Sequence, residues 1–230
     1  MEFLKDNKSL EALNLELNNP ELLKAYKMPF DNYRPRFLPR LLGNFLVGCG
    51  NFVYGKKPTY LKFRAIEVIA RVPYHSWSSV AYTLLTMFYS DEKKALNLSG
   101  IEKYARVAQD NETMHVVVIS HLTRMEEKVG FLRHALIPMI FAFFYFWASY
   151  FLYLFIPRSS LELNYLFEQH AFYQYNLFLE VRGEELKKKP IDSEFLRWYG
   201  RNPRNQYEFF LSVRNDEIIH RNQSLREINS

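Results

Sequence analysis

Apolar residues recur at helical spacing over long stretches of the chain, and turn-forming clusters between them are few. With only 8 glycines in 230 residues, this pattern favours long helices over a many-stranded sheet. The first long helix should kink at Pro73, because proline cannot donate a backbone hydrogen bond to Ile69. The predicted helices cover about residues 60–90, 101–128, 135–157 and 160–182, and a last helix carries Pro203 in its first turn.

The segments between these helices are predicted to be irregular or short. Residues 1–33 are polar and are expected to form an N-terminal arm with one short helix, ahead of one domain over residues 34–230. Loops are expected over residues 90–100 and 183–195, with a short helix after the second loop. The length suits one domain with a sizeable core.

Two apolar segments indicate contact with a membrane. Within residues 34–53, Arg34, Arg36 and Arg40 accompany leucine and phenylalanine side chains at helical spacing. This pattern is typical of a helix lying in the membrane interface, and a helix packed on the core is the alternative. The segment over residues 135–157 is long enough to span a bilayer.

Charge and cysteine content indicate which surface the protein binds and which redox compartment it occupies. The net charge of +5 fits an anionic membrane surface better than nucleic acid, because no dense lysine and arginine stripe alternates with the aromatic residues. The single cysteine, Cys49, excludes an internal disulfide and fits a reducing compartment. The N-terminal stretch has no apolar core of a signal peptide and is too acidic for a transit peptide.

Two Glu-x-x-His motifs carry the candidate chemistry. "DNETMH" contains Glu112 and His115, and "RNDEIIH" contains Glu217 and His220. At this spacing the two side chains of each motif lie on one face of a helix. One such motif alone is more often a solvated helix face than half of a metal site.

Two lone glutamates in largely apolar or aromatic stretches complete a larger set, distributed over four predicted helices. Its members are Glu67, Glu112, His115, Glu168, Glu217 and His220. Di-iron carboxylate bundles use this ligand pattern: two helices each supply one glutamate, and two other helices each supply one Glu-x-x-His motif. Two divalent ions neutralise four buried carboxylates, and iron suits mixed oxygen and nitrogen donors better than zinc. We therefore predict an all-α, ferritin-like four-helix bundle with two iron ions.

Tyr175 lies two helical turns after Glu168, on the same helix face and about 10 Å along the axis. We expect it near the metals as a redox-active or hydrogen-bonding group, and a packed core tyrosine is the alternative. The other histidines lack the ligand pattern and are interpreted as ordinary core or surface residues: His75, His121, His134 and His170.

Several stretches resemble the alternative oxidases, which are membrane-bound di-iron quinol oxidases, and more narrowly their plastid terminal oxidase branch. They are "IEVIARVPY", "NETMH", "FYFWASYFLYLFIPR", "FEQHAFYQYNLFL", "GEELKKKP" and "RNDEIIH", from about residue 60 to the end. "ARVPY" is informative, because mitochondrial relatives usually carry Pro-Gly where this chain has Pro73 and Tyr74. The resemblance implies a plastoquinol:oxygen oxidoreductase that makes water and pumps no protons.

The resemblance also implies roles for the candidate ligands. In the family pattern Glu112 and Glu217 bridge the metals, and Glu67 and Glu168 are terminal ligands. Tyr175 matches the family's essential tyrosine.

Four more positions match family positions around the site. Asn111 and Asp216 correspond to residues that support the metal ligands. Lys62 stands where relatives usually have arginine, and Gln174 where many have threonine. Both of these positions border the family's quinol pocket, which leaves the head-group specificity open.

The ligand order constrains the membrane topology. Residues 135–157 lie between His115 and Glu168, so a single crossing would leave ligands on opposite sides of the membrane. Residues 34–53 precede every ligand and cannot restore one common side. We therefore expect monotopic attachment to a thylakoid or cytoplasmic membrane, with the bundle on the cytoplasmic or stromal face.

Three functions remain open at this point. The first is the quinol oxidase. Its expected partners are plastoquinol or another quinol, O2 and membrane lipid, and we expect the chain to form a homodimer. The second is a di-iron hydroxylase or desaturase that acts on another lipidic substrate. The third is a membrane-associated iron-binding or scaffold protein, which would not need Tyr175 on the ligand face.

Overall fold

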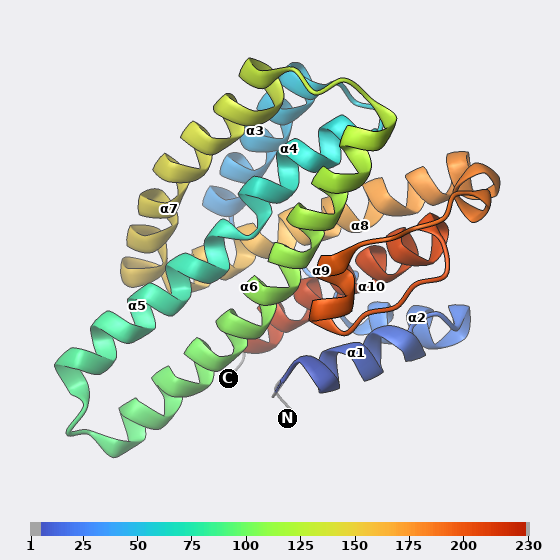
Figure 1. Ribbon diagram of the computed structural model, residues 1–230. Helices are drawn as coiled ribbons and strands as arrows, with labels where there is room; N and C mark the ends of the chain where they lie inside the picture. The colour runs from blue at the N-terminus through green and yellow to red at the C-terminus, as the bar shows by residue number, and fades with distance from the viewer. Residues whose placement is uncertain (1–5, 229–230) are drawn as a thin grey trace.

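The computed structural model describes residues 6–228, and these residues form helices without any strand (Figure 1). The α-helices are α1 (Asn7–Glu16), α2 (Pro20–Lys27), α3 (Phe37–Tyr54), α4 (Tyr60–Ala70), α5 (Val72–Phe88), α6 (Glu92–Glu126), α7 (Ile137–Phe155), α8 (Pro157–Lys188), α9 (Glu194–Tyr199) and α10 (Gln206–Ile228). A 3-10 turn covers Met28–Phe30, and a π-helical segment over Leu132–Leu136 leads into α7. The predicted all-α class is confirmed.

Four long helical segments form the bundle. α8 packs along α10, and α6 packs against the consecutive helices α4 and α5. The predicted kink is a break at Arg71 between α4 and α5, where Pro73 lies in the first turn of α5. Proline is tolerated there because the first backbone amides of a helix have no partner within the helix.

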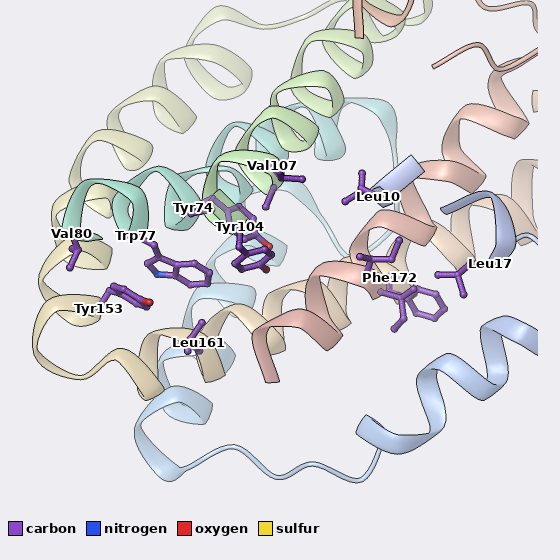
Figure 2. Packing of buried hydrophobic residues seen from close by; sticks show 14 residues of the cluster. Leu10, Leu17, Tyr74, Trp77, Val80, Tyr104, Val107, Tyr153, Leu161 and Phe172 are labelled. Atoms are coloured by element: carbon purple, nitrogen blue, oxygen red, sulfur yellow. The ribbon is translucent and has the colours of Figure 1, made fainter. Parts of the chain in front are cut away.

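Two clusters of buried apolar side chains lie along the bundle. One contains Trp77 and Tyr104 together with Leu10 from α1, as Figure 2 shows. The other contains Phe178 and its aromatic neighbours. On α6, the members of the first cluster precede Glu112 and those of the second follow it. The polar centre therefore lies between two apolar clusters, which exclude water from both sides.

The N-terminal arm is more ordered than the predicted irregular segment with one short helix. It forms two α-helices, and the side chains of Asp6 and Asn19 cap their N-termini. Leu10 and Leu17 of this arm are fully buried or nearly so, and α1 packs on α10. The prediction failed because the partners that bury this polar segment lie at the other end of the chain.

Both predicted loops are shorter than expected: residues 89–91 separate α5 from α6, and residues 189–193 separate α8 from the short helix α9, which was predicted. Residues 92–100 belong to α6, whose first turn is capped by Asp91 through a 3.1 Å hydrogen bond from the Lys94 amide. Gly100 is exposed within that helix, where glycine costs only about 1 kcal/mol relative to alanine. α8 continues to Lys188, because Gly183 leaves room for the Tyr207 ring; an added Cβ would lie 3.2 Å from it.

The last helix begins three residues after Pro203 rather than around it. The side chain of Asn205 accepts a 3.0 Å hydrogen bond from the Glu208 amide, which is the geometry of an N-cap. Pro203 therefore lies in the connection between α9 and α10. The same connection carries Arg201, which is buried beneath the bundle surface.

α3 and α7 lie on the same side of the bundle (Figure 1). The two segments predicted around residues 34–53 and 135–157 are helical, as expected. Among the described residues, Leu132–Phe155 alone is long and apolar enough to cross a membrane. An 18-residue window of this segment has a mean hydropathy of 1.8, and only 11% of the window is buried. The exposed aromatic side chains of α7 are Phe141, Phe143, Phe144, Trp147, Phe151 and Phe155.

Candidate metal centre

Four helices bring the predicted ligands together in the centre of the bundle. α4 contributes Glu67, α8 contributes Glu168, and the Glu-x-x-His pairs come from α6 and α10. Each of the six residues is at most 2% exposed. The i, i+3 spacing explains the pairs, because it points both side chains of a motif from one helix face into the interior.

His115 lies at the middle of the tightest group. Its Nδ1 atom is 3.6 Å from Glu67 Oε2, 3.4 Å from Glu112 Oε2 and 3.6 Å from Glu217 Oε1. The donor atoms of these four residues all lie within 4.8 Å of one another. His220 lies just outside this group, with its Nε2 atom 3.5 Å from Glu112 Oε1. Glu112 therefore directs one oxygen toward each histidine.

Several donor atoms in this centre are buried without a hydrogen-bond partner among the described residues. They are Glu67 Oε2, Glu112 Oε1 and Oε2, His115 Nδ1, Glu217 Oε1 and His220 Nδ1. Buried polar atoms normally have partners, so such a concentration at one point requires an explanation. Carboxylate oxygens and imidazole nitrogens are donors that iron accepts, and the set therefore fits a pair of metal ions.

The carboxylates would be strongly perturbed in the absence of a metal ion. Burial raises the pKa of Glu112 and of Glu217 well above the ordinary value, and the neighbouring carboxylates raise both further. Burial also raises the pKa of Glu168. Divalent cations would reverse these shifts, because they stabilise the ionised form of each ligand.

The two histidines are held by crosswise partners. His115 on α6 forms a 2.9 Å hydrogen bond through Nε2 with Asp216 on α10. His220 on α10 forms a 2.9 Å hydrogen bond through Nε2 with Asn111 on α6. In each motif the residue before the glutamate thus holds the histidine of the other motif. Both Nδ1 atoms remain available for a metal, and the opposite nitrogen fixes the ring orientation.

The charges around the two histidines differ. Burial lowers the pKa of His220 to about 3. Burial acts on His115 in the same direction, but Glu112 and Asp216 outweigh it and raise the pKa of His115 well above its ordinary value. The neutral amide of Asn111 behind one ring and the carboxylate of Asp216 behind the other make the two halves of the centre unequal.

Two tyrosines contact Glu67 and Glu168, the glutamates outside the Glu-x-x-His motifs. The Tyr175 hydroxyl donates a hydrogen bond to Glu67 Oε1, and the ring stacks on Phe63 with 4.1 Å between centroids. Tyr74 donates a 2.7 Å hydrogen bond to Glu168 Oε1. Tyr175 therefore lies at the centre, as predicted. Sequence reasoning used Tyr74 only as a mark of the family branch and did not predict its contact.

The network behind Asp216 was also missed. Arg201 Nη1 donates a 2.6 Å hydrogen bond to Asp216 Oδ2, and Asn14 Nδ2 donates one of 2.5 Å to Oδ1. Burial acts to raise the pKa of Asp216, but Arg201 and His115 outweigh it and hold this pKa well below the usual range. Arg201 and Asn14 lie outside every recognised motif, so no local pattern in the sequence marked them.

An apolar cavity of about 190 Å³ connects the centre with α3 and α7. Glu67, Glu168, Glu217 and Tyr175 line its inner end. The apolar lining includes Leu46, Ile66, Ile137, Phe141 and Phe167. Such a cavity can hold one aromatic ring, since cavities of about 150 Å³ bind benzene.

Lys62 and Gln174 also line this cavity, next to each other. Lys62 is buried, and its Nζ atom donates to Gln174 Oε1 at 3.1 Å, to Asn51 Oδ1 at 2.9 Å and to the Lys56 carbonyl at 3.2 Å. Burial lowers the pKa of Lys62. A polar group thus lies on the wall of an otherwise apolar cavity, which is the usual design of a small-molecule site.

The fold and the centre together define a helical-bundle protein with a candidate di-metal carboxylate site. A family model described as "Alternative oxidase" matches residues 37–227, and the chain therefore belongs to the alternative oxidase family. The predicted family is confirmed.

The chain is similar to the protein named "Ubiquinol oxidase 4, chloroplastic/chromoplastic" of Arabidopsis thaliana, with 28% identity over 184 residues. The match covers 70% of this chain and 49% of the relative, so the chain spans about half the length of this curated relative. This relative agrees with the predicted plastid branch. No solved structure matches the chain.

Proposed function

We propose that this protein is a membrane-associated quinol oxidase that oxidises a plastoquinol-type quinol and reduces O2 to water. The observation that carries the proposal is the buried set of unpartnered carboxylate and imidazole atoms at the inner end of an apolar cavity. Family membership and the chloroplast relative agree with this reading. A hydroxylase or desaturase for another lipidic substrate is the second candidate, since it could use the same ligands.

The ligand set would hold two iron ions. Glu112 faces both histidines, which supports a bridging role for it. Glu67 and Glu168 each accept a tyrosine hydrogen bond through one oxygen, which supports a role as terminal metal ligands for both. Glu217 would be the second bridging ligand. The iron pair would supply O2 binding and one-electron redox chemistry, which the side chains alone lack.

The cavity would bind the quinol head group. We propose that the side-chain amide N–H of Gln174 contacts a quinol oxygen, and that Lys62, which donates to Gln174 Oε1, holds this amide in place on the cavity wall. Tyr175 lines the inner end of the same cavity and donates a hydrogen bond to Glu67. It can therefore pass its hydroxyl proton to Glu67 and take a proton back from the quinol side, while the same hydrogen bond orients the carboxylate on the metal side. Asn111 and Asp216 would keep the two histidines oriented for the metals.

The membrane would lie against α3 and α7. Their exposed apolar side chains would be buried in one leaflet, which is the arrangement of a monotopic protein. Because α6 and α8 supply ligands to the same centre on either side of α7 in the chain, α7 cannot cross the bilayer once. A site on one side of the membrane, at the thylakoid or cytoplasmic membrane, would also explain oxidation without proton pumping. The homodimer and the domain boundary at residue 34 stay predictions.

The test is oxygen uptake by purified, iron-loaded protein with decyl-plastoquinol as the only reductant. We expect two quinols to be consumed per O2, with no oxygenated organic product, and about two iron atoms per chain. A hydroxylase would consume O2 only with a second substrate and would leave a hydroxylated product. No uptake by iron-loaded protein with any quinol would refute the proposal.

A further inference from the structure

The described part of the N-terminal arm, residues 6–33, covers a face of α10 that would otherwise meet solvent. Of the 23 residues in α10, 15 are buried. The buried polar residues include Asn215, Asp216, Arg221 and Asn222. Buried polar groups without partners destabilise a fold, so this face requires polar partners from outside the bundle.

The arm supplies those partners along its whole length. Asn215 Nδ2 donates to the Asn14 carbonyl at 2.9 Å, and Asn222 Nδ2 donates to the Tyr26 carbonyl at 2.8 Å. Further along, Arg221 Nη1 donates to Asp31 Oδ1 at 2.6 Å. These contacts attach the arm to α10, and most of them do not touch the metal centre.

One pair of contacts is different, because it ends on Asp216. Asn14 Nδ2 donates to Asp216 Oδ1 at 2.5 Å. Glu11 accepts hydrogen bonds from Arg201 at 2.9 Å and 2.5 Å, and Arg201 in turn donates to Asp216 Oδ2 at 2.6 Å. Two independent routes from α1 therefore fix the carboxylate of Asp216. That carboxylate holds Nε2 of His115 at 2.9 Å.

We propose that α1 supports the metal centre. Glu11 and Asn14 of α1, together with Arg201, are positioning residues for His115. A ligand histidine is oriented by the partner of its second nitrogen. Asp216 can orient His115 only if its own oxygens are held, and α1 together with Arg201 holds both. The partner of His220, Asn111, receives no contact from the arm; its amide donates to Tyr199 and Asp216. The arm therefore contacts the support of His115 directly, and that of His220 only through Asp216.

This inference rests on the proposed metal site and is tested by metal binding rather than by turnover alone. The variants are Asn14→Leu, which removes a donor to Asp216, and Glu11→Gln, a milder change that weakens the hold on Arg201. Asp31→Asn is the matched control, because it weakens an equally close arm contact to α10 that does not involve Asp216. Each full-length variant is titrated anaerobically with Fe(II), and its iron is examined by Mössbauer spectroscopy.

We expect Asn14→Leu to weaken one of the two Fe(II) equivalents by about 10- to 100-fold, the range for partners of metal ligands. Glu11→Gln should weaken the same equivalent less, and one of the two Mössbauer signals should change in both variants. Asp31→Asn should leave both equivalents and both signals as in the parent, at a comparable loss of melting temperature. If Asp31→Asn weakens iron as much as Asn14→Leu does, or if both arm variants bind two iron ions as the parent does, the arm is only a structural cover. A parent protein that binds no iron would instead refute the proposed function.

Discussion

α7 and α10 reverse the usual relation between side-chain polarity and burial. α7 is rich in aromatic and aliphatic residues, yet only 3 of its 19 residues are buried. α10 carries many polar and charged side chains, yet 15 of its 23 residues are buried. Apolar side chains on the surface and polar ones inside each require a specific compensating environment.

The compensating environments are different in kind. For α7 we propose lipid, in which an exposed phenylalanine is as favourable as in a protein core. For α10 the compensation is a set of direct partners: the N-terminal arm on one face and the metal-ligand cluster on the other. The difference teaches that the burial of a helix here follows from what surrounds it and not from its own hydropathy.

The strongest test of the polar side of this comparison is Glu217→Ala. This change removes a proposed bridging ligand from α10 and leaves the other carboxylates with insufficient charge to hold two irons. We expect the loss of most of the iron and of all measurable quinol oxidation. Iron analysis and oxygen uptake on one sample check this, with Glu184→Ala at an exposed position of α8 as the control. Full iron content and full turnover in Glu217→Ala would contradict the ligand assignment.

Tyr175→Phe tests the boundary between the metal centre and the cavity. Only a hydroxyl group is lost, so the fold and the iron content should be unchanged. Turnover should fall at least about 100-fold, the scale of removing a positioned proton-transfer group. Tyr173→Phe, on the exposed face of the same helix, serves as control. If Tyr175→Phe turns over near the parent rate, Tyr175 is only a packed aromatic residue; if it loses iron, its role is structural.

On the apolar side, Phe144→Glu should weaken membrane binding. Burial of a phenylalanine contributes about 1.5–3 kcal/mol, so replacing it by a charge should lower the partition into vesicles at least about tenfold. Sedimentation with anionic lipid vesicles measures this. Trp198→Glu, an exposed aromatic position on α9, is the control and should sediment like the parent. Equal loss for both variants would argue against a membrane face on α7.

Lys62→Met should affect quinol binding more than the chemistry. The change removes the charge-assisted hydrogen bond that orients Gln174, worth about 1.5–3 kcal/mol, and we expect the KM for decyl-plastoquinol to rise about tenfold with little change in kcat. Steady-state kinetics against Lys57→Met, at an exposed lysine, provides the comparison. An unchanged KM would place the head group away from Lys62.

The smallest expected effect is the pH dependence of stability. Burial raises the pKa of Glu112 and of Glu217 in the metal-free folded state. A folded-state pKa above the unfolded value of about 4.3 favours folding below that pH, and this contribution is lost as the pH rises through the folded-state pKa. The melting temperature of metal-free protein should therefore decline above about pH 4.3, whereas iron-loaded protein should gain stability as its ligands deprotonate more easily. Parallel curves for the two forms would contradict this.

Local patterns in the sequence determined a large part of this protein. The two Glu-x-x-His motifs, the lone Glu67 and Glu168, and the apolar stretch of α7 depend only on spacing along one helix. The structure brings the six predicted ligand residues to one buried centre, and their role as ligands stays a prediction. Helix boundaries were less predictable. The cap at Asp91 and the packing of Gly183 against Tyr207 extended helices through segments that composition alone marked as loops.

Tertiary structure alone decided how the centre is supported. The crosswise contacts from Asn111 and Asp216 to the opposite histidines join residues about a hundred positions apart, and the contact between Glu11 and Arg201 joins the two ends of the chain. Helical periodicity reports which face of one helix a residue occupies, but it carries no information about which other helix meets that face. That choice depends on packing the whole chain at once, and it turned a polar N-terminal segment into a layer that covers α10.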